Sequence, residues 1–297
     1  MLSVLIPVFN FDVNALVAVL SKQAGELSIP FEIIVLDDAS DEKFKNINRK
    51  INDIPGVSYI ELGQNIGRSK IRNQLAGKAL YDNLLFLDCD SEIIVPDFIR
   101  NYSKYFDCSC AVCGGLTYNN TAPLEYNQYL RWYYGHNREF KSAEIRNKNP
   151  YASFSSFNFM INKKIFKEIR FEETIVNYGH EDTLFGYELK KRNIEVRHID
   201  NPMSHVRLET NMHFIEKTKE GIENLKHIMK INGNEKHLIK DITLLWYYSI
   251  FRRLNLVAFI NFLYRKTETL LLKNLTGKRP NLFIFDLYKL GYLCSLG

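Results

Sequence analysis

The sequence predicts an α/β protein with a mostly parallel central sheet, helices on both faces of that sheet, and a helical extension at the C-terminus. Short apolar runs rich in β-branched residues alternate with longer mixed segments over residues 1–90. The connecting segments are long enough for helical crossovers between parallel strands. A third observation is a change of composition near residue 235, where apolar and aromatic residues become interleaved with basic ones.

The expected elements follow in order along the chain. The second half is less periodic, and a polar stretch at residues 138–150 has the composition of a mobile loop over a site. We expect one domain over residues 1–234, with a nucleotide-binding half (1–105) and a second half (106–234), and an extension over residues 235–297. The expected strands are residues 3–8, 32–36, 57–62, 84–87 and 195–199, and the expected helices are residues 13–24, 42–52, 68–80, 181–193 and 212–231.

The excess positive charge lies in the extension. The 297-residue chain has a net charge of +5, and its 46% hydrophobic and 25% charged residues exclude wholesale disorder. Residues 235–297 contain ten Lys or Arg and four Asp or Glu, whereas the preceding residues hold 29 basic and 30 acidic groups. The longest uncharged run of the extension, residues 254–264, is too short to span a bilayer.

This composition favours helices that lie in a membrane interface, and a helical pair packed on the domain is the alternative. Because the basic residues lie in an apolar tail and not across a polar face, nucleic-acid binding is disfavoured.

The five cysteines have neither the number nor the spacing of a disulfide framework, which fits a reducing compartment. Cys108, Cys110 and Cys113 lack the further ligands that a closed metal site needs. We expect no signal peptide, because Met1 leads straight into a strand-like run. We therefore expect a cytoplasmic protein, at the inner face of the cell membrane.

Ligands of open parallel sheets bind beyond the carboxyl ends of the strands. Three loops of this chain lie there, at residues 9–10, 37–41 and 88–90. In the last of them, Asp88 and Asp90 are two residues apart, so both side chains point to the same side of an extended segment. Such a pair suits Mg²⁺ or Mn²⁺ with open positions for phosphates, and a polar strand end followed by a helix cap is the alternative.

Asp38 follows a buried strand, where a carboxylate accepts a hydrogen bond from a nucleobase imide or a ribose hydroxyl. The alternative is an N-cap for the helix that starts near residue 42, a role that Ser40 or Asp41 fills better. Further along, Gly67 opens a helix with Arg68 and Arg72 one turn apart, and this arrangement suits phosphate oxygens.

Five motifs together resemble glycosyltransferase family 2, of the bacterial polysaccharide type. The resemblance covers residues 1–230 and implies the GT-A fold, Rossmann-like, with an acceptor-binding second half. The motifs, in order, are Pro7-Val8-Phe9-Asn10, Asp37-Asp38-Ala39-Ser40, Asn65-x-Gly67-x-x-x-x-Arg72-Asn73, Phe86-Leu87-Asp88-Cys89-Asp90 and Gly179-His180-Glu181-Asp182.

The resemblance also implies roles for single residues. Asp38 would bind the uracil of a donor nucleotide, and Phe9 would pack near the base. Asp90 would ligate Mn²⁺ or Mg²⁺, and Asp88 would be shared between the metal and the ribose. The full set implied for the nucleotide-sugar donor is Pro7, Phe9, Asp38, Asn65, Gly67, Arg72 and Asp88.

For the acceptor side, Asp182 would be the catalytic base and Glu181 a hydrogen-bond partner of the acceptor sugar. A helix N-terminus stabilises an ionised carboxylate, so we expect Asp182 to be a weak base. Without the resemblance, a capping box is the alternative for this pair. Gly179 and His180 would line the acceptor pocket.

A histidine downstream of the Glu-Asp motif often serves as a third metal ligand in related enzymes. His205 is the first candidate, and neutral imidazole suits Mn²⁺. His198 and His213 are the alternatives.

These expectations describe a metal-dependent, inverting glycosyltransferase that moves a sugar from a UDP-sugar to a glycan or lipid-linked oligosaccharide in surface polysaccharide synthesis. A nucleotidyltransferase and a non-catalytic nucleotide-sugar or glycan-binding module are the alternatives. The former needs a glycine-rich phosphate loop after the first strand, and Pro7-Val8-Phe9-Asn10 is not one.

Overall fold

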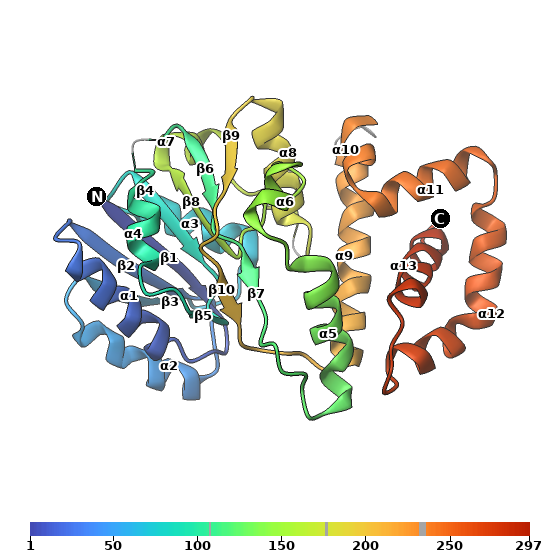
Figure 1. The fold of residues 1–297 in the computed structure, drawn as a ribbon, viewed down its shortest axis with the longest axis horizontal. Helices are drawn as coiled ribbons and strands as arrows, with labels where there is room; N and C mark the ends of the chain where they lie inside the picture. Colours follow the sequence, from blue (N-terminus) through green and yellow to red (C-terminus); the bar gives the residue numbers. More distant parts are fainter. Residues whose placement is uncertain (107, 176–177, 232–235) are drawn as a thin grey trace. The chain divides into compact units, whose positions relative to one another are not determined.

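The computed structural model describes residues 1–106, 108–175, 178–231 and 236–297 (Figure 1). Its main sheet has seven strands in the order β3-β2-β1-β4-β8-β6-β9. The first four strands along the chain are parallel to one another, and β8 is antiparallel to both of its neighbours. The strands are β1 (Leu2–Val8), β2 (Phe31–Asp37), β3 (Val57–Glu61), β4 (Asn83–Leu87), β6 (Cys110–Cys113), β8 (Asn158–Asn162) and β9 (Glu195–His198).

Helices cover both faces of this sheet, which confirms the predicted fold class. Alternate residues of β1 point to opposite faces: Val4 and Ile6 pack with the helices on one face, and Leu5 packs with those on the other. The first face carries α1 (Asn14–Glu26) and α4 (Phe98–Ser103), and the second carries α3 (Arg68–Lys78), α7 (Lys163–Ile169) and α8 (Glu181–Lys191). The predicted helix over 42–52 is α2 (Glu42–Asn48) followed by a 3₁₀ turn (Arg49–Asp53).

A second sheet, of three strands, positions residues of the candidate site. It has the order β5-β10-β7, formed by β5 (Ser91–Ile93), β10 (Met203–His205) and β7 (Leu116–Thr117). Antiparallel pairing of β5 with β10 sets His205 opposite Ser91. The residues after the Asp-x-Asp motif are thereby joined to a segment more than a hundred positions away.

Residues 138–150 are not the mobile loop that their polarity suggested. Ala143–Asn147 forms the short helix α6, whose N-cap Ser142 accepts a hydrogen bond from the Ile145 N–H. Arg146 is buried, and its guanidinium bonds the carbonyl oxygens of Cys113, Gly114 and Ile199. Arg146 thus satisfies buried carbonyl oxygens of distant segments, while most other polar side chains of residues 138–150 are exposed.

The chain forms two compact units. The sheet unit comprises the described parts of residues 1–119, 140–176 and 181–207; the helical unit comprises those of residues 120–139, 177–180 and 208–297. The predicted boundary between residues 234 and 235 lies outside the described residues. The helical unit contains α5 (Tyr129–Tyr134), α9 (Asn211–Ile231), α10 (Lys236–Asp241), α11 (Thr243–Arg253), α12 (Val257–Leu275) and α13 (Leu282–Ser295).

The C-terminal helices share a core with α9. Phe214 and Ile215 of α9 pack with Tyr264 of α12 and with Phe285 and Tyr288 of α13. A second cluster joins other α9 residues to α11. In the parts of the chain that the structure describes, no helix is both long and apolar enough to cross a membrane.

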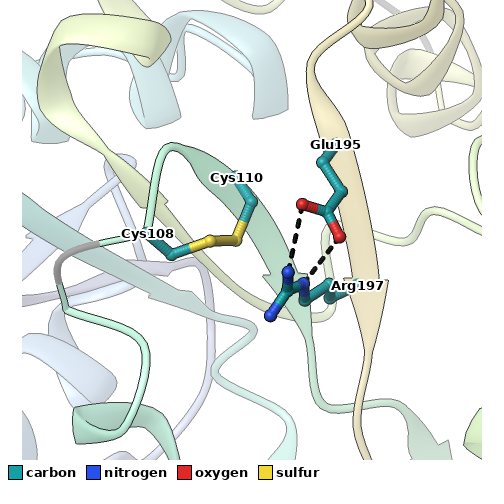
Figure 2. The surroundings of a disulfide bond; sticks show 4 residues. All are labelled: Cys108, Cys110, Glu195 and Arg197. Carbon is teal, nitrogen blue, oxygen red and sulfur yellow. Dashed lines mark hydrogen bonds and ion pairs between the residues drawn. A yellow bond between two sulfur atoms is a disulfide. The ribbon is translucent and has the colours of Figure 1, made fainter.

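A disulfide links Cys108 to Cys110 at the start of β6 (Figure 2). The neighbouring strand β9 carries Glu195 and Arg197, whose side chains form an ion pair beside it. The sequence predicted no disulfide framework, and this bond joins residues only two apart, so it links no distant segments. Cys89, Cys113 and Cys294 are free thiols.

Gly114 is expected to tolerate no side chain. A Cβ atom there would lie 2.5 Å from the Asn158 amide nitrogen and the Tyr102 hydroxyl, and against the Asn201 carbonyl oxygen. We expect Gly114→Ala to lower the free energy of unfolding by about 3 kcal/mol, measured by urea titration. The matched control is Gly77→Ala in α3, where a Cβ meets nothing within 4 Å and should stabilise by about 0.5–1 kcal/mol. Equal urea midpoints for the two variants would contradict this account.

Candidate active site

The loops after β1 and β2 are locked together at the carboxyl edge of the main sheet. The Asn10 N–H donates to Ser40 Oγ at 2.8 Å, and the Asp41 N–H donates to Asn10 Oδ1 at 2.7 Å. Ala39 adopts a left-handed φ of 62°, which costs about 1–2 kcal/mol for a residue with a Cβ atom. Phe9 is 49% exposed at this edge, so its ring is open to a planar ligand. Pro7 lies within β1, opposite Leu36.

Asp38 is buried and holds the turn that leads into α3. Its carboxylate accepts hydrogen bonds from the N–H groups of Ile66 at 2.7 Å and Gly67 at 3.1 Å, at the start of α3. Asn65 Nδ2 donates to the Asp38 carbonyl at 3.2 Å. Burial raises the pKa of Asp38, which these two backbone hydrogen bonds partly offset. Asp38, Asn65 and Gly67 are thus brought together, and contact with uracil stays a prediction.

Arg72 lies inside the protein and does not face open solvent. Its side chain is 2% exposed, and its guanidinium bonds Asp88 Oδ1 at 2.7 Å and Glu181 Oε1 at 3.3 Å. Both ends of the guanidinium are thus engaged within the protein, which disfavours the expected contact with donor phosphates. Arg68, the first residue of α3, is 46% exposed and forms a longer ion pair with the same Glu181 oxygen, at 3.9 Å. Glu181 is buried as well and bonds Arg72, which disfavours the expected direct hydrogen bond to an acceptor sugar.

Asp90 and His205 face each other across the small sheet. Asp90 Oδ2 lies 3.6 Å from His205 Nε2, and the Val206 N–H donates to the Asp90 carbonyl at 3.1 Å. The imidazole stacks between the rings of Tyr118 and Phe157, with centroids 5.7 Å away on each side. This packing holds the imidazole in one orientation beside the carboxylate.

The other two histidines are placed differently. His198 is buried, with one ring nitrogen 2.8 Å from Arg146 and the other 2.9 Å from the Pro150 carbonyl. Burial lowers the pKa of His198 to about 4, so it is a neutral structural residue. His213 belongs to α9 in the helical unit and pairs with Glu216 on the same helix.

Asp90 and His205 together offer a divalent cation one carboxylate and one imidazole. Among the residues that the structure describes, no three His, Cys, Asp or Glu side chains are gathered as a metal site. Asp88 is directed to Arg72 and is therefore not a third ligand in this arrangement. Carboxylate oxygen and neutral imidazole nitrogen both suit Mn²⁺, and Mg²⁺ and Mn²⁺ sites commonly leave positions for water and substrate phosphates.

Asp182 lies in the first turn of α8 and has the opposite pKa shift to the one expected. Burial, followed by the negative charge of Glu181, raises the pKa of Asp182 to about 7. The favourable field of a helix N-terminus is too small to offset desolvation of this size. A base with a pKa near the working pH is an efficient proton acceptor, so Asp182 is better suited to general-base catalysis than predicted.

Gly179 and His180 precede this helix with left-handed φ angles of 96° and 68°. Within the helical unit, Asn224 Nδ2 donates to the carbonyl oxygens of Tyr178 and Gly179. The segment is therefore held by α9, and its role towards an acceptor stays a prediction.

Three aromatic residues of the site were not anticipated. Tyr118 and Phe157 clamp His205, and Phe171 lies under the Arg72 guanidinium at 5.4 Å from its ring centroid. They come from separate segments, and no local spacing distinguishes them from core aromatics. A sequence signal for them would require knowledge of the sheet pairing.

Comparisons with known proteins agree with this geometry. The model of the family described as Glycosyl transferase family 2 matches residues 3–170. Over 239 residues, the chain is 24% identical to chondroitin synthase of Escherichia coli. The matched region covers 69% of this chain and 34% of that protein. The chain is also 24% identical over 241 residues to chondroitin synthase of Pasteurella multocida, with 69% and 24% covered. The chain thus spans about a third or less of these relatives.

Solved structures share the fold. Staphylococcus aureus TarS 1-349 in complex with UDP superposes with a TM-score of 0.53 at 17% identity, covering 98% of this chain and 89% of that one. The mannosyltransferase PcManGT from Pyrobaculum calidifontis, in complex with GDP-Man and Mn²⁺, gives 0.52 at 13% identity, covering 77% and 64%. These likenesses confirm the predicted GT-A fold. Since the family model matches more than half of its residues, the chain belongs to glycosyl transferase family 2.

Proposed function

We propose that the protein transfers a sugar from a UDP-sugar to a hydroxyl group of a glycan or lipid-linked oligosaccharide, with inversion at the anomeric carbon. The observation that carries this proposal is the half-buried Asp182, whose pKa is raised towards neutrality, joined through Glu181 and Arg72 to Asp88 at the carboxyl edge of the sheet. The likeness to chondroitin synthases and to structures that hold UDP or GDP-Man supports it.

In this proposal, Asp182 accepts the proton of the acceptor hydroxyl as that oxygen attacks the anomeric carbon. The bond between the anomeric carbon and the diphosphate oxygen breaks, and UDP leaves with the electron pair. Asp90 and His205 would hold Mn²⁺ or Mg²⁺, which when bound neutralises charge on the leaving diphosphate. Phe9 packs on the base, and the exposed Arg68 meets the diphosphate.

A donor screen tests this function. We expect UDP-sugars to raise the Tm of the protein, more with Mn²⁺ than with chelator, because a ligand at 100 times its Kd stabilises by about 2.7 kcal/mol. GDP-sugars serve as the control for base recognition, and mass spectrometry of an incubated oligosaccharide detects the added sugar. If neither nucleotide shifts the Tm, the donor assignment is wrong; if nucleotides bind but no sugar moves, a non-catalytic binding module replaces it.

We also propose that α12 places the enzyme on the anionic inner face of the cell membrane, next to a lipid-linked acceptor. Phe259, Phe262, Leu263 and Leu270 are 44–68% exposed on this helix. Between residues 252 and 273, all of which are described, the exposed side chains include five basic residues and no acidic one. The single carboxylate of α12, Glu268, bonds the Tyr264 hydroxyl and Lys219. An apolar face set among cations suits anionic lipid.

Vesicle sedimentation checks this surface. The double variant Phe259→Glu, Phe262→Glu should lose at least about 10-fold in affinity for phosphatidylserine vesicles, because two exposed rings no longer enter the interface. The control variant Leu80→Glu removes an equally exposed apolar side chain of the sheet unit and should bind vesicles as wild type does. Unchanged binding of the double variant, or equal binding to phosphatidylcholine alone, would refute this placement.

A further inference from the structure

Arg72 bonds one carboxylate of each acidic motif, the pair Asp88 and Asp90 and the pair Glu181 and Asp182. It bonds Asp88 of one motif at 2.7 Å and Glu181 of the other at 3.3 Å. The other member of each motif is directed elsewhere: Asp90 lies 3.6 Å from His205 Nε2, and Asp182 accepts a hydrogen bond from the Thr183 N–H at 2.7 Å. The buried Arg72 guanidinium thus links the acidic motif proposed for the metal to the acidic motif proposed for proton transfer.

The surroundings of Arg72 hold its guanidinium in place. The Phe171 ring lies beneath it at 5.4 Å. Asn73, the residue after Arg72, holds the backbone of Phe171. Asn73 Oδ1 accepts a hydrogen bond from the Phe171 N–H and Asn73 Nδ2 donates one to the Phe171 carbonyl, both at 2.9 Å. Arg72 therefore has a rigid support on α3, and its 2% exposure leaves almost no surface for a ligand.

A guanidinium is suited to this position because it is planar and offers donors in several fixed directions, so it can bond two carboxylates at once. An ammonium group is a point charge that satisfies one of them well. Loss of the cation would leave Asp88 without this partner and the buried Glu181 with the longer, 3.9 Å ion pair to Arg68, which is destabilising.

We propose that Arg72 is a positioning residue, which holds Asp88 and Glu181 and thereby sets the places of Asp90 and Asp182, and that Arg68 is the arginine of α3 that meets the donor diphosphate. The division follows from burial and contact distance: Arg72 is enclosed and bonds two acids, whereas Arg68 is 46% exposed and lies 3.9 Å from Glu181. Its second half rests on the proposed function, because it presumes a diphosphate donor.

UDP binding measured in chelator separates the two arginines, because the metal then contributes nothing. Arg72→Met should bind UDP within about 2-fold of wild type, whereas Arg68→Met should bind at least about 10-fold more weakly. In transfer assays, Arg72→Met should lower kcat by about 100-fold with a small change in donor KM, since the reacting groups are displaced. Arg68→Met should mainly raise donor KM. Equal loss of metal-free UDP affinity in both variants would overturn the proposal.

A stability cycle tests the positioning role without any substrate. Arg72→Met should lower the Tm by about 10 °C, and Arg72→Lys by less. Adding Glu181→Gln to Arg72→Met should recover a substantial part of that loss, whereas Glu181→Gln alone should destabilise, because it removes a partner from Arg72. If Arg72→Met fails to fold, the Arg72→Lys and double variants still report the coupling.

Additive Tm changes in this cycle would overturn the positioning role. If no form of the protein binds UDP, the proposed donor fails, while the stability cycle still decides whether Arg72 holds the two acids.

Discussion

Asp182→Asn is expected to lower the rate of sugar transfer by about 10²- to 10⁴-fold, the range that a positioned general base contributes. The amide keeps the shape of the side chain but cannot accept the acceptor's proton. Affinity for UDP should stay close to that of wild type, because the Asp182 carboxylate accepts its hydrogen bonds from the neighbouring Thr183 N–H and hydroxyl, which an amide oxygen can also do. Initial rates of transfer and calorimetric UDP binding measure the two quantities. The control is Glu188→Gln on the same helix, whose partners are Lys191 and Arg192 at the surface.

The raised pKa of Asp182 predicts that both the transfer rate and the stability of the protein depend on pH. Because burial raises the pKa of Asp182 to about 7, the wild-type rate should rise with pH through about 7 and level off above it. The stability effect has the opposite sign. Near pH 4 the folded carboxylate is protonated; as pH rises towards 7, the unfolded chain has already ionised, so this group progressively costs stability.

Asp182→Asn should therefore have a higher Tm than wild type at pH 8, with little difference at pH 4. A wild-type rate that is flat between pH 5 and pH 8, or a Tm difference independent of pH, would contradict the assignment. Such a residue would trade stability for a usable base.

Asp90→Ala is expected to remove the part of UDP affinity that depends on Mn²⁺ or Mg²⁺, a loss of at least about 10-fold when metal is present. The structure offers one carboxylate and one imidazole as ligands, so deletion of either halves the protein's contribution to the site. In chelator, the variant and wild type should bind UDP equally. His205→Ala should behave similarly, whereas His198→Asn should leave the metal dependence intact, because His198 bonds Arg146 and the Pro150 carbonyl.

Titration of UDP in parallel with and without Mn²⁺ measures this effect. Retention of the metal dependence in Asp90→Ala would show that the cation is held elsewhere.

Most of the sheet was predictable because a parallel strand covered on both faces reads as a continuous apolar run that stops at its polar end. Residues 84–87 were expected as a strand, and the structure has Asn83–Leu87, ending directly before Asp88. The prediction for residues 138–150 was wrong for a related reason. A polar stretch is typical of a loop, but Arg146 of this stretch is buried and bonds carbonyl oxygens of segments that lie far away in the sequence. Local composition carries no information on such partners.

The local pattern of residues was enough to predict the succession of strands and helical crossovers along residues 1–90, the polar loops at the carboxyl ends of the strands and the two acidic motifs. The tertiary structure decided which acid of each motif is engaged: Arg72 takes Asp88 and Glu181, and the pairing of β5 with β10 brings His205 to Asp90. It also decided the direction of the pKa shift of Asp182. The physical reason is that strand patterns are local, whereas desolvation and ion pairing depend on groups brought together from distant parts of the chain.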